Sequence, residues 1–87
     1  MVSKKVKVIN YSGLHLRPAG ILCKEAMSFS SNVTLKYNGG EANAKSVLSI
    51  LGACVKMGDE VEIVCDGEDE DKALESVIKV ISEGLGE

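Results

Sequence analysis

The tripeptide Asn38-Gly39-Gly40 lies between two segments of alternating polar and apolar residues and limits the possible folds more than any other feature. Val33, Leu35 and Tyr37 alternate with polar residues before it, and Glu41 to Ala44 follow it. Asn-Gly is a preferred hairpin turn because both positions tolerate a positive φ angle. The pattern predicts two antiparallel strands, and therefore a sheet built at least partly of hairpin-connected strands.

Two further segments have the period of two that is typical of half-buried strands. Lys5-Val6-Lys7-Val8 predicts a first strand over about 2–9. Val61, Ile63 and Cys65 predict a fourth strand, which the Asp66-Gly67 turn ends.

Three segments have helical character. The first covers about 16–28 and contains Pro18, whose missing N–H group costs nothing in a first turn. Ser46 is expected to cap a short apolar helix over about 47–53. The third, over about 69–84, is amphipathic, begins with the acidic residues 68–71 at its positively polarised end and stops at Gly84.

The predicted order is β-α-β-β-α-β-α, which corresponds to an α/β (α+β) fold. We expect an open-faced β-sandwich, in which three helices cover one face of a four-stranded antiparallel sheet. The chain has 87 residues, so we expect one domain over residues 1–87.

Composition narrows the classes of function. The net charge of −3 argues against a general nucleic-acid binder, which normally carries a basic stripe. No window approaches the roughly 20 apolar residues of a membrane span, and the N-terminal residues lack the apolar core of a signal peptide. We therefore expect a cytoplasmic protein without membrane insertion.

Metal and redox chemistry are not expected. Cys23, Cys54 and Cys65 have no C-x-x-C spacing, and the chain contains a single histidine. We expect three buried or half-buried thiols, no metal site and no cofactor.

The most informative segment runs from Gly13 to Ala19. It places the only histidine and the only arginine, His15 and Arg17, two residues apart where a turn meets a helix start. Unpaired N–H groups and the helix dipole favour an anion there, and Arg17 adds a planar set of donors for phosphate oxygens. A neutral imidazole is a competent nucleophile. These residues are also compatible with a simple helix cap and a solvated arginine.

The segment Gly13-Leu14-His15-Leu16-Arg17-Pro18-Ala19 resembles the active-site motif of the HPr family, the histidine phosphocarriers of the bacterial sugar phosphotransferase system. The resemblance extends over essentially the whole chain. It implies that enzyme I, phosphorylated by phosphoenolpyruvate, transfers the phosphoryl group to Nδ1 of His15. The phosphorylated form then donates it to the IIA domains of sugar permeases.

The same resemblance implies roles for the residues around His15. Arg17 would orient and neutralise the phosphate, and Pro18 would begin the helix that supplies backbone N–H groups. The protein would be a carrier with a transient phosphohistidine and no cofactor, not an independent catalyst. Gly20 departs from the family pattern, in which many relatives carry Ala, Thr or Ser.

A second segment, Lys45-Ser46-Val47-Leu48, resembles the regulatory serine motif of HPr proteins from Gram-positive-type bacteria. There an ATP-dependent HPr kinase/phosphorylase modifies the serine, and the product acts with catabolite control protein A in carbon catabolite repression. Ser46 would be that site. A phosphoserine at a helix N-terminus is stabilised by the dipole and the free N–H groups, and a plain N-cap role is compatible with it.

The short helix carries more apolar residues than one face can bury. We expect Ile50, Ala53 and Cys54 to point inward and the other apolar residues to form a docking surface, flanked by Lys24 and Lys45. That surface would consist of Leu16, Gly20, Lys24, Met27, Val47, Leu48 and Leu51.

The sequence is also compatible, to differing degrees, with other functions. A regulatory binding module acting mainly through Ser46 is disfavoured because such paralogues are expected to lack the histidine. A nitrogen-regulatory branch of the family is compatible with the motif, and an RNA-binding domain fits poorly with few aromatic residues and an acidic balance. We expect a monomer; the sugars served are set by the permeases.

Overall fold

The computed structural model describes residues 1–87. Its elements follow the predicted order. They are β1 (Val2–Lys7), α1 (Leu16–Met27), β2 (Asn32–Tyr37), β3 (Gly40–Asn43), α2 (Val47–Gly52), β4 (Glu60–Asp66) and α3 (Glu70–Ser82).

The four strands form one antiparallel sheet in the order β1-β4-β2-β3. The predicted hairpin joins β2 to β3, with Tyr37 opposite Gly40 and positive φ angles of 53° at Asn38 and 83° at Gly39. Two successive positive φ angles are those of a type I′ turn, whose twist suits the flanking strands.

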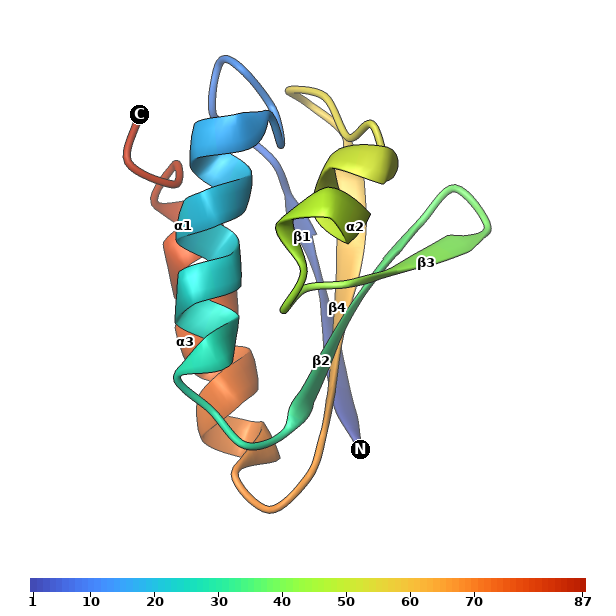
Figure 1. The fold of residues 1–87 in the computed structure, drawn as a ribbon, viewed down its shortest axis with the longest axis vertical. Helices are drawn as coiled ribbons and strands as arrows, with labels where there is room; N and C mark the ends of the chain where they lie inside the picture. The colour runs from blue at the N-terminus through green and yellow to red at the C-terminus, as the bar shows by residue number, and fades with distance from the viewer.

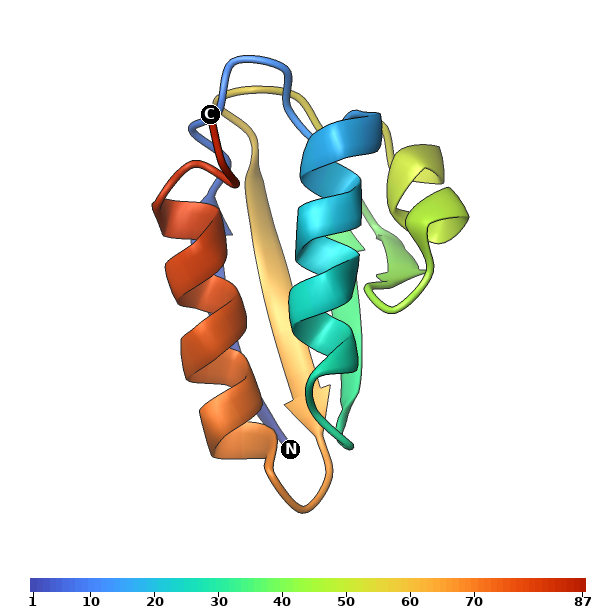
Figure 2. The same cartoon turned by 60° about the vertical axis from the view of Figure 1, so that its left-hand side comes forward.

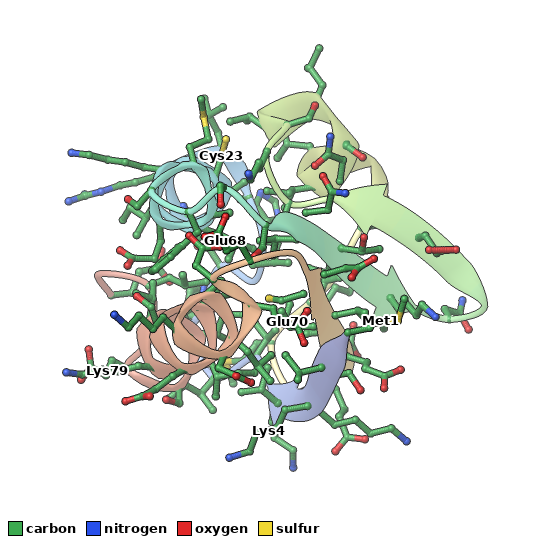
Figure 3. All side chains as sticks on the ribbon, turned by 90° about the horizontal axis from the view of Figure 1, so that it is seen from below. Met1, Lys4, Cys23, Glu68, Glu70 and Lys79 are labelled. Atoms are coloured by element: carbon green, nitrogen blue, oxygen red, sulfur yellow. The ribbon has the colours of Figure 1, made fainter.

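All three helices cover the same face of the sheet (Figures 1 and 2). Helix α3 packs on β1 and β4, α2 packs on β3, and α1 lies between the other two helices. Figure 3 views α1 and α3 along their axes, with Lys4 and Lys79 reaching into solvent. None of the three helices combines the length and the apolarity needed to cross a bilayer.

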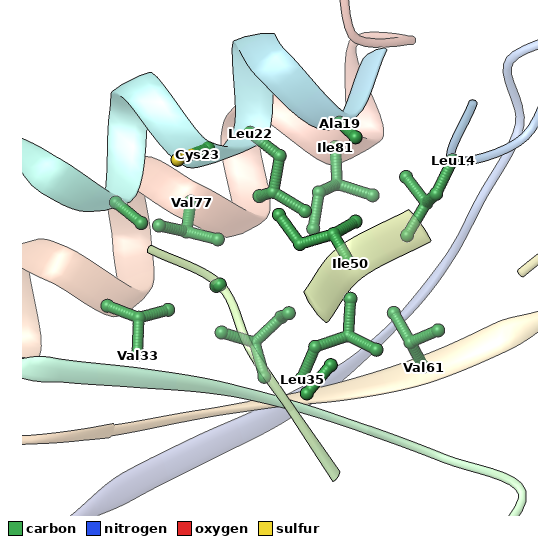
Figure 4. Packing of buried hydrophobic residues seen from close by; sticks show 14 of the residues in the cluster. Leu14, Ala19, Leu22, Cys23, Val33, Leu35, Ile50, Val61, Val77 and Ile81 are labelled. Atoms are coloured by element: carbon green, nitrogen blue, oxygen red, sulfur yellow. The ribbon is translucent and has the colours of Figure 1, made fainter. Parts of the chain in front are cut away.

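One cluster of 19 buried hydrophobic residues fills the space between helices and sheet (Figure 4). The sheet contributes alternate residues, as the period of a strand requires, and the helices contribute residues three or four apart. From the sheet come Val33, Leu35, Val61, Ile63 and Cys65, and from the helices Leu22, Ala26, Ile50, Ala73, Val77 and Ile81.

The other face of the sheet is largely polar, with Val64 as an apolar exception, and its charges alternate across the strands. Lys5 lies opposite Glu62, Glu62 opposite Lys36, and Lys36 opposite Glu41. Opposite charges on neighbouring strands stabilise pairing modestly, and like charges would destabilise it. This arrangement is consistent with a solvated face.

Some element ends differ from the predicted ones. Strand β1 stops at Lys7 because the backbone of Val8 bonds instead to the loop before β4, through Asp59 O (2.8 Å) and Gly58 N (2.7 Å). Helix α3 ends at Ser82, and its end is closed by bonds from Gly84 N to Ile81 O and from Leu85 N to Val80 O, each 3.1 Å. This is a Schellman motif with the expected glycine at φ +92°.

The start of α3 also differs in detail. Asp69 immediately precedes the helix, and its carboxylate accepts hydrogen bonds from Ser30 N (3.0 Å), Ser31 N (2.9 Å) and Ser31 Oγ. These bonds lower the pKa of Asp69 to about 2, the Ser31 hydroxyl being the largest cause. Asp69 therefore joins α3 to the α1–β2 loop, a role beyond the expected interaction with the helix dipole.

Candidate functional site

The loop before α1 is held against the loop before β4. Gly13 N bonds to Asn10 O (3.1 Å), which closes the predicted turn, and Leu14 N bonds to Val55 O (3.0 Å). Gly13 has a φ of +64°, and a Cβ atom there would lie 2.6 Å from Val55 O. Only glycine allows both this backbone angle and this close approach.

His15 is the N-cap residue of α1, with extended backbone angles (φ −77°, ψ −175°). Its carbonyl accepts the first helical bond, from Ala19 N at 2.8 Å, but its ring makes no capping hydrogen bond. His15 thus occupies the N-cap position, but its ring does not cap the helix and its imidazole is exposed.

The first turn of α1 offers donors to an anion next to this ring. The N–H groups of Leu16 and Arg17 have no acceptor within the helix, and the turn contains no acidic residue. Pro18 occupies the third helical position, where its lack of an N–H group breaks no helical bond. Arg17 is exposed on the same turn. Donors, dipole and guanidinium together favour a phosphoryl group near His15.

His15 also lines a shallow hollow of about 260 Å³. The hollow lies between the start of α1, the end of α2 and the loop before β4. Its lining consists of Leu14, His15, Leu51, Cys54, Val55 and Lys56.

Cys54 corrects the sequence prediction. It was expected to point inward, but its thiol is exposed, whereas Cys23 and Cys65 are buried. Helix α2 ends at Gly52. Cys54 lies two residues further on and has a φ of +56°, a left-handed backbone angle that residues other than glycine adopt at some cost. The turn this angle creates takes Cys54 out of the helical register on which the prediction depended.

The predicted docking residues lie on α1 and α2, which pack against each other. Leu16 (70%), Met27 (65%) and Leu48 (82%) are strongly exposed for large apolar side chains, and Lys24 is exposed beside them. Gly20 is half-buried, as are Val47 and Leu51, both of which pack partly on the core. The predicted inward position of Ile50 is confirmed, since it is fully buried.

Lys45 was expected to flank this surface, and it is half-buried rather than fully exposed. Its ammonium group donates a hydrogen bond to Phe29 O (2.7 Å), just beyond the C-terminal end of α1. A cation near the end of a helix is favoured by the helix dipole, so this contact is a stabilising one.

Ser46 caps α2, as predicted. Its Oγ accepts a hydrogen bond from Ser49 N (3.2 Å), and its side chain is half-buried. The neighbouring Ser49 accepts a bond from Asn43 N (2.8 Å), which ties the helix to the end of β3.

No pattern in the sequence indicated a contact between the loop before α1 and Glu87 at the C-terminal end of the chain. Ser12 N (3.1 Å) and Ser12 Oγ donate to the two carboxylate oxygens of Glu87, and Asn10 Nδ2 lies 3.4 Å from Glu87 Oε1. The Ser12 bonds are the largest causes of a lowered pKa of Glu87, and the charge of Arg17 lowers it further. The partners are 75 and 77 residues apart, so no local pattern indicates them.

Comparison with known proteins identifies the family of the chain. The family model described as "PTS HPr component phosphorylation site" matches residues 2–83. The chain belongs to the HPr phosphocarrier family. Proteins of this family carry phosphoryl groups and are not independent catalysts.

Individual relatives of this HPr-family chain include the phosphocarrier protein HPr of Mycoplasma capricolum. It is 43% identical over 65 residues, which are 75% of this chain and 73% of the relative. HPr-C-His of Thermoanaerobacter tengcongensis has a crystal structure with a TM-score of 0.96 at 31% identity, covering 100% of this chain and 98% of that one. Crh, a catabolite repression protein of Bacillus subtilis solved as a dimer with a swapped domain, has a TM-score of 0.78 at 39% identity, covering 97% of each chain.

Proposed function

We propose that the chain is the phosphocarrier of a phosphoenolpyruvate-dependent sugar phosphotransferase system. It accepts a phosphoryl group from phospho-enzyme I on Nδ1 of His15 and donates it to the IIA domains of sugar permeases. The observation that carries this proposal is the position of His15 at the N-terminus of α1. Its ring is exposed and makes no capping hydrogen bond, and free backbone N–H groups lie in the adjacent first turn. Family membership supports it.

The proposed chemistry needs no group beyond those of the chain and its partner. The Nδ1 lone pair attacks phosphorus, and the bond from phosphorus to its donor atom in enzyme I breaks as the N–P bond forms. The electron pair of the broken bond returns to that donor. Arg17 and the free N–H groups of the first turn would stabilise the charge on the phosphoryl oxygens during transfer in either direction.

The exposed apolar residues on α1 and α2 would provide the docking surface for both partners. Leu16, Met27 and Leu48 form its solvent-facing part, and Lys24 adds positive charge for acidic surfaces. Gly20, Val47 and Leu51 complete the proposed set. We further propose that residues 1–87 act as one monomeric domain in the cytoplasm, in contrast to the dimer described for Crh.

The test is phosphoryl transfer from phosphoenolpyruvate through purified enzyme I. We expect wild-type protein to gain one acid-labile phosphate on His15 and His15→Ala to gain none, because the chain has no other histidine. Lys79→Ala, an exposed change on α3, is the matched control and should be labelled at the wild-type rate. Mass mapping locates the phosphate, and circular dichroism checks that the variants are folded. Normal labelling of His15→Ala would refute the proposal.

We also propose that Ser46 is phosphorylated by an ATP-dependent HPr kinase/phosphorylase, and that this form acts with catabolite control protein A. A phosphate on Ser46 would lie at the start of α2, where free N–H groups and the dipole favour it. Its charge would oppose the docking of a phosphorylated or acidic partner on the adjacent surface, and so would slow transfer at His15.

Ser46→Ala should lose labelling by the kinase and ATP but retain transfer through His15. The lost cap should lower the free energy of unfolding by about 1 kcal/mol. Ser49→Ala, a neighbouring serine of the same helix, should still be labelled. Undiminished labelling of Ser46→Ala would place the modified residue elsewhere.

The likeness to Crh supports a second candidate, a regulatory binding module that acts mainly through Ser46. This candidate predicts labelling by the kinase without transfer from enzyme I. The presence of His15 favours the carrier, and the two labelling assays separate the candidates. A carrier in a nitrogen-regulatory branch would be labelled by its own enzyme I and not by that of a sugar system.

A further inference from the structure

Glu87 binds the loop that leads into His15. Two atoms of Ser12, its backbone N and its Oγ, donate to the Glu87 carboxylate, and Asn10 Nδ2 lies at the edge of hydrogen-bonding distance from it. In Figures 1 and 2 the C-terminal segment lies at the same end of the molecule as this loop and the start of α1. The last residues of the chain are thus joined to the approach to His15.

The segment that presents Glu87 is itself well held. Leu85 is 1% exposed and takes part in the Schellman end of α3, and Glu87 N bonds to Gly84 O at 3.0 Å. Gly86 lies against Ile21 of α1, since a Cβ atom there would be 3.0 Å from Ile21 Cδ1. The carboxylate therefore projects from a fixed backbone and not from a free tail.

Asn10 transmits this contact to the turn. Asn10 is 3% exposed, and its Nδ2 also donates to Gly13 O. Since Gly13 O and Glu87 Oε1 are both acceptors, they determine which way the amide group points. The Nδ2 group of this buried side chain thus links the turn to the C-terminal segment.

We propose that Glu87 is a positioning residue for phosphoryl transfer, which holds the turn of residues 10–13 and thereby the backbone from which His15 projects. This inference rests on the proposed role of His15 as the phosphoryl acceptor. The turn contains the permissive Gly13, and fixing it limits the orientations in which the imidazole meets a phosphoryl donor. Small errors in such alignment slow transfer even when every reacting group is present.

The test compares three variants in the enzyme I transfer assay. Glu87→Ala removes both acceptor oxygens and should lower kcat/KM by about three- to tenfold, the rate equivalent of one ordinary hydrogen bond. Glu87→Gln keeps one acceptor oxygen for Ser12 and should recover part of the loss. Glu83→Ala removes an exposed carboxylate of the same segment and should transfer like the wild type.

A second readout separates positioning from general stability. Hydrogen exchange of the Ser12 N–H group should be faster in Glu87→Ala, whereas the amides of β4 should stay protected. Ser12→Ala should lower kcat/KM less in the Glu87→Ala background than in the wild type, because both changes break the same contact.

The outcomes distinguish this inference from the proposed function. Faster exchange at Ser12 with kcat/KM equal to that of Glu83→Ala would overturn the positioning role and leave the carrier function intact. Unchanged exchange at Ser12 would also overturn it, because the contact would then not hold the turn. A wild-type chain that accepts no phosphate from enzyme I would refute the carrier function itself.

Discussion

Two glycines near His15 have opposite environments. Gly13 has a positive φ, and an added Cβ atom would meet the backbone of Val55 and Lys56 at 2.6–2.9 Å. Gly20 lies within α1, and an added Cβ atom would meet nothing within 4 Å. The first glycine is required by the loop, whereas the second leaves room for a side chain on the proposed docking surface.

Gly20→Ala should stabilise the protein by about 0.5–1 kcal/mol, because glycine in a helix loses more backbone entropy on folding than alanine does. Gly13→Ala should destabilise it by more than about 1 kcal/mol, because alanine is strained at that φ and meets backbone atoms. Urea denaturation measures both changes.

The same pair tests the local geometry. A loss of stability in Gly20→Ala would contradict the open space around that position. A stability gain in Gly13→Ala would contradict the close packing of the loop against Val55.

At the scale of the elements, α3 is joined to the α1–β2 loop by the Asp69 carboxylate. The ionised carboxylate accepts the bonds from Ser30 and Ser31, and its pKa in the folded state is about 2. An unfolded aspartate has a pKa of about 3.9, so the unfolded state binds a proton more readily. The stabilisation is therefore present above about pH 4 and is lost as the pH falls toward 2.

Asp69→Asn should lower the thermal midpoint at pH 6, and its deficit relative to the wild type should shrink between pH 4 and pH 2. Asp71→Asn, an exposed change in the first turn of the same helix, is the control, and its difference from the wild type should vary less over this range. Thermal melts at several pH values measure both. A deficit of Asp69→Asn that persists at pH 2 would contradict a role for the ionised carboxylate.

At the scale of the whole molecule, the parts of the candidate site meet at one end. The loop before α1, the loop before β4 and the C-terminal segment come from distant parts of the sequence and share hydrogen bonds there. The buried cluster between the sheet and the helices lies beneath them. The sheet and helices act as a rigid support for the exposed loops that would carry the proposed phosphoryl transfer.

Much of this arrangement could be predicted from local patterns. The strand alternation and the Asn38-Gly39 turn predicted the hairpin, and Ser46 and Gly84 predicted two helix ends. The Gly13–Ala19 segment predicted the family, which the family model confirms, and the start of α1 at which the candidate site lies. These signals act over a few residues, through backbone geometry and side-chain period, and so can be read without the tertiary structure.

The sequence by itself determined the order of the elements, the turn at Asn38 and the place of His15 at the start of a helix. Only the tertiary structure decided that Cys54 faces solvent, that Lys45 binds Phe29 O, and that Asp69 and Glu87 each join distant segments. Those contacts depend on how helices and loops pack, and partners up to 77 residues apart leave no periodic trace in the chain. A carboxylate near a helix end looks the same in sequence whether it is solvated or holds a loop in place.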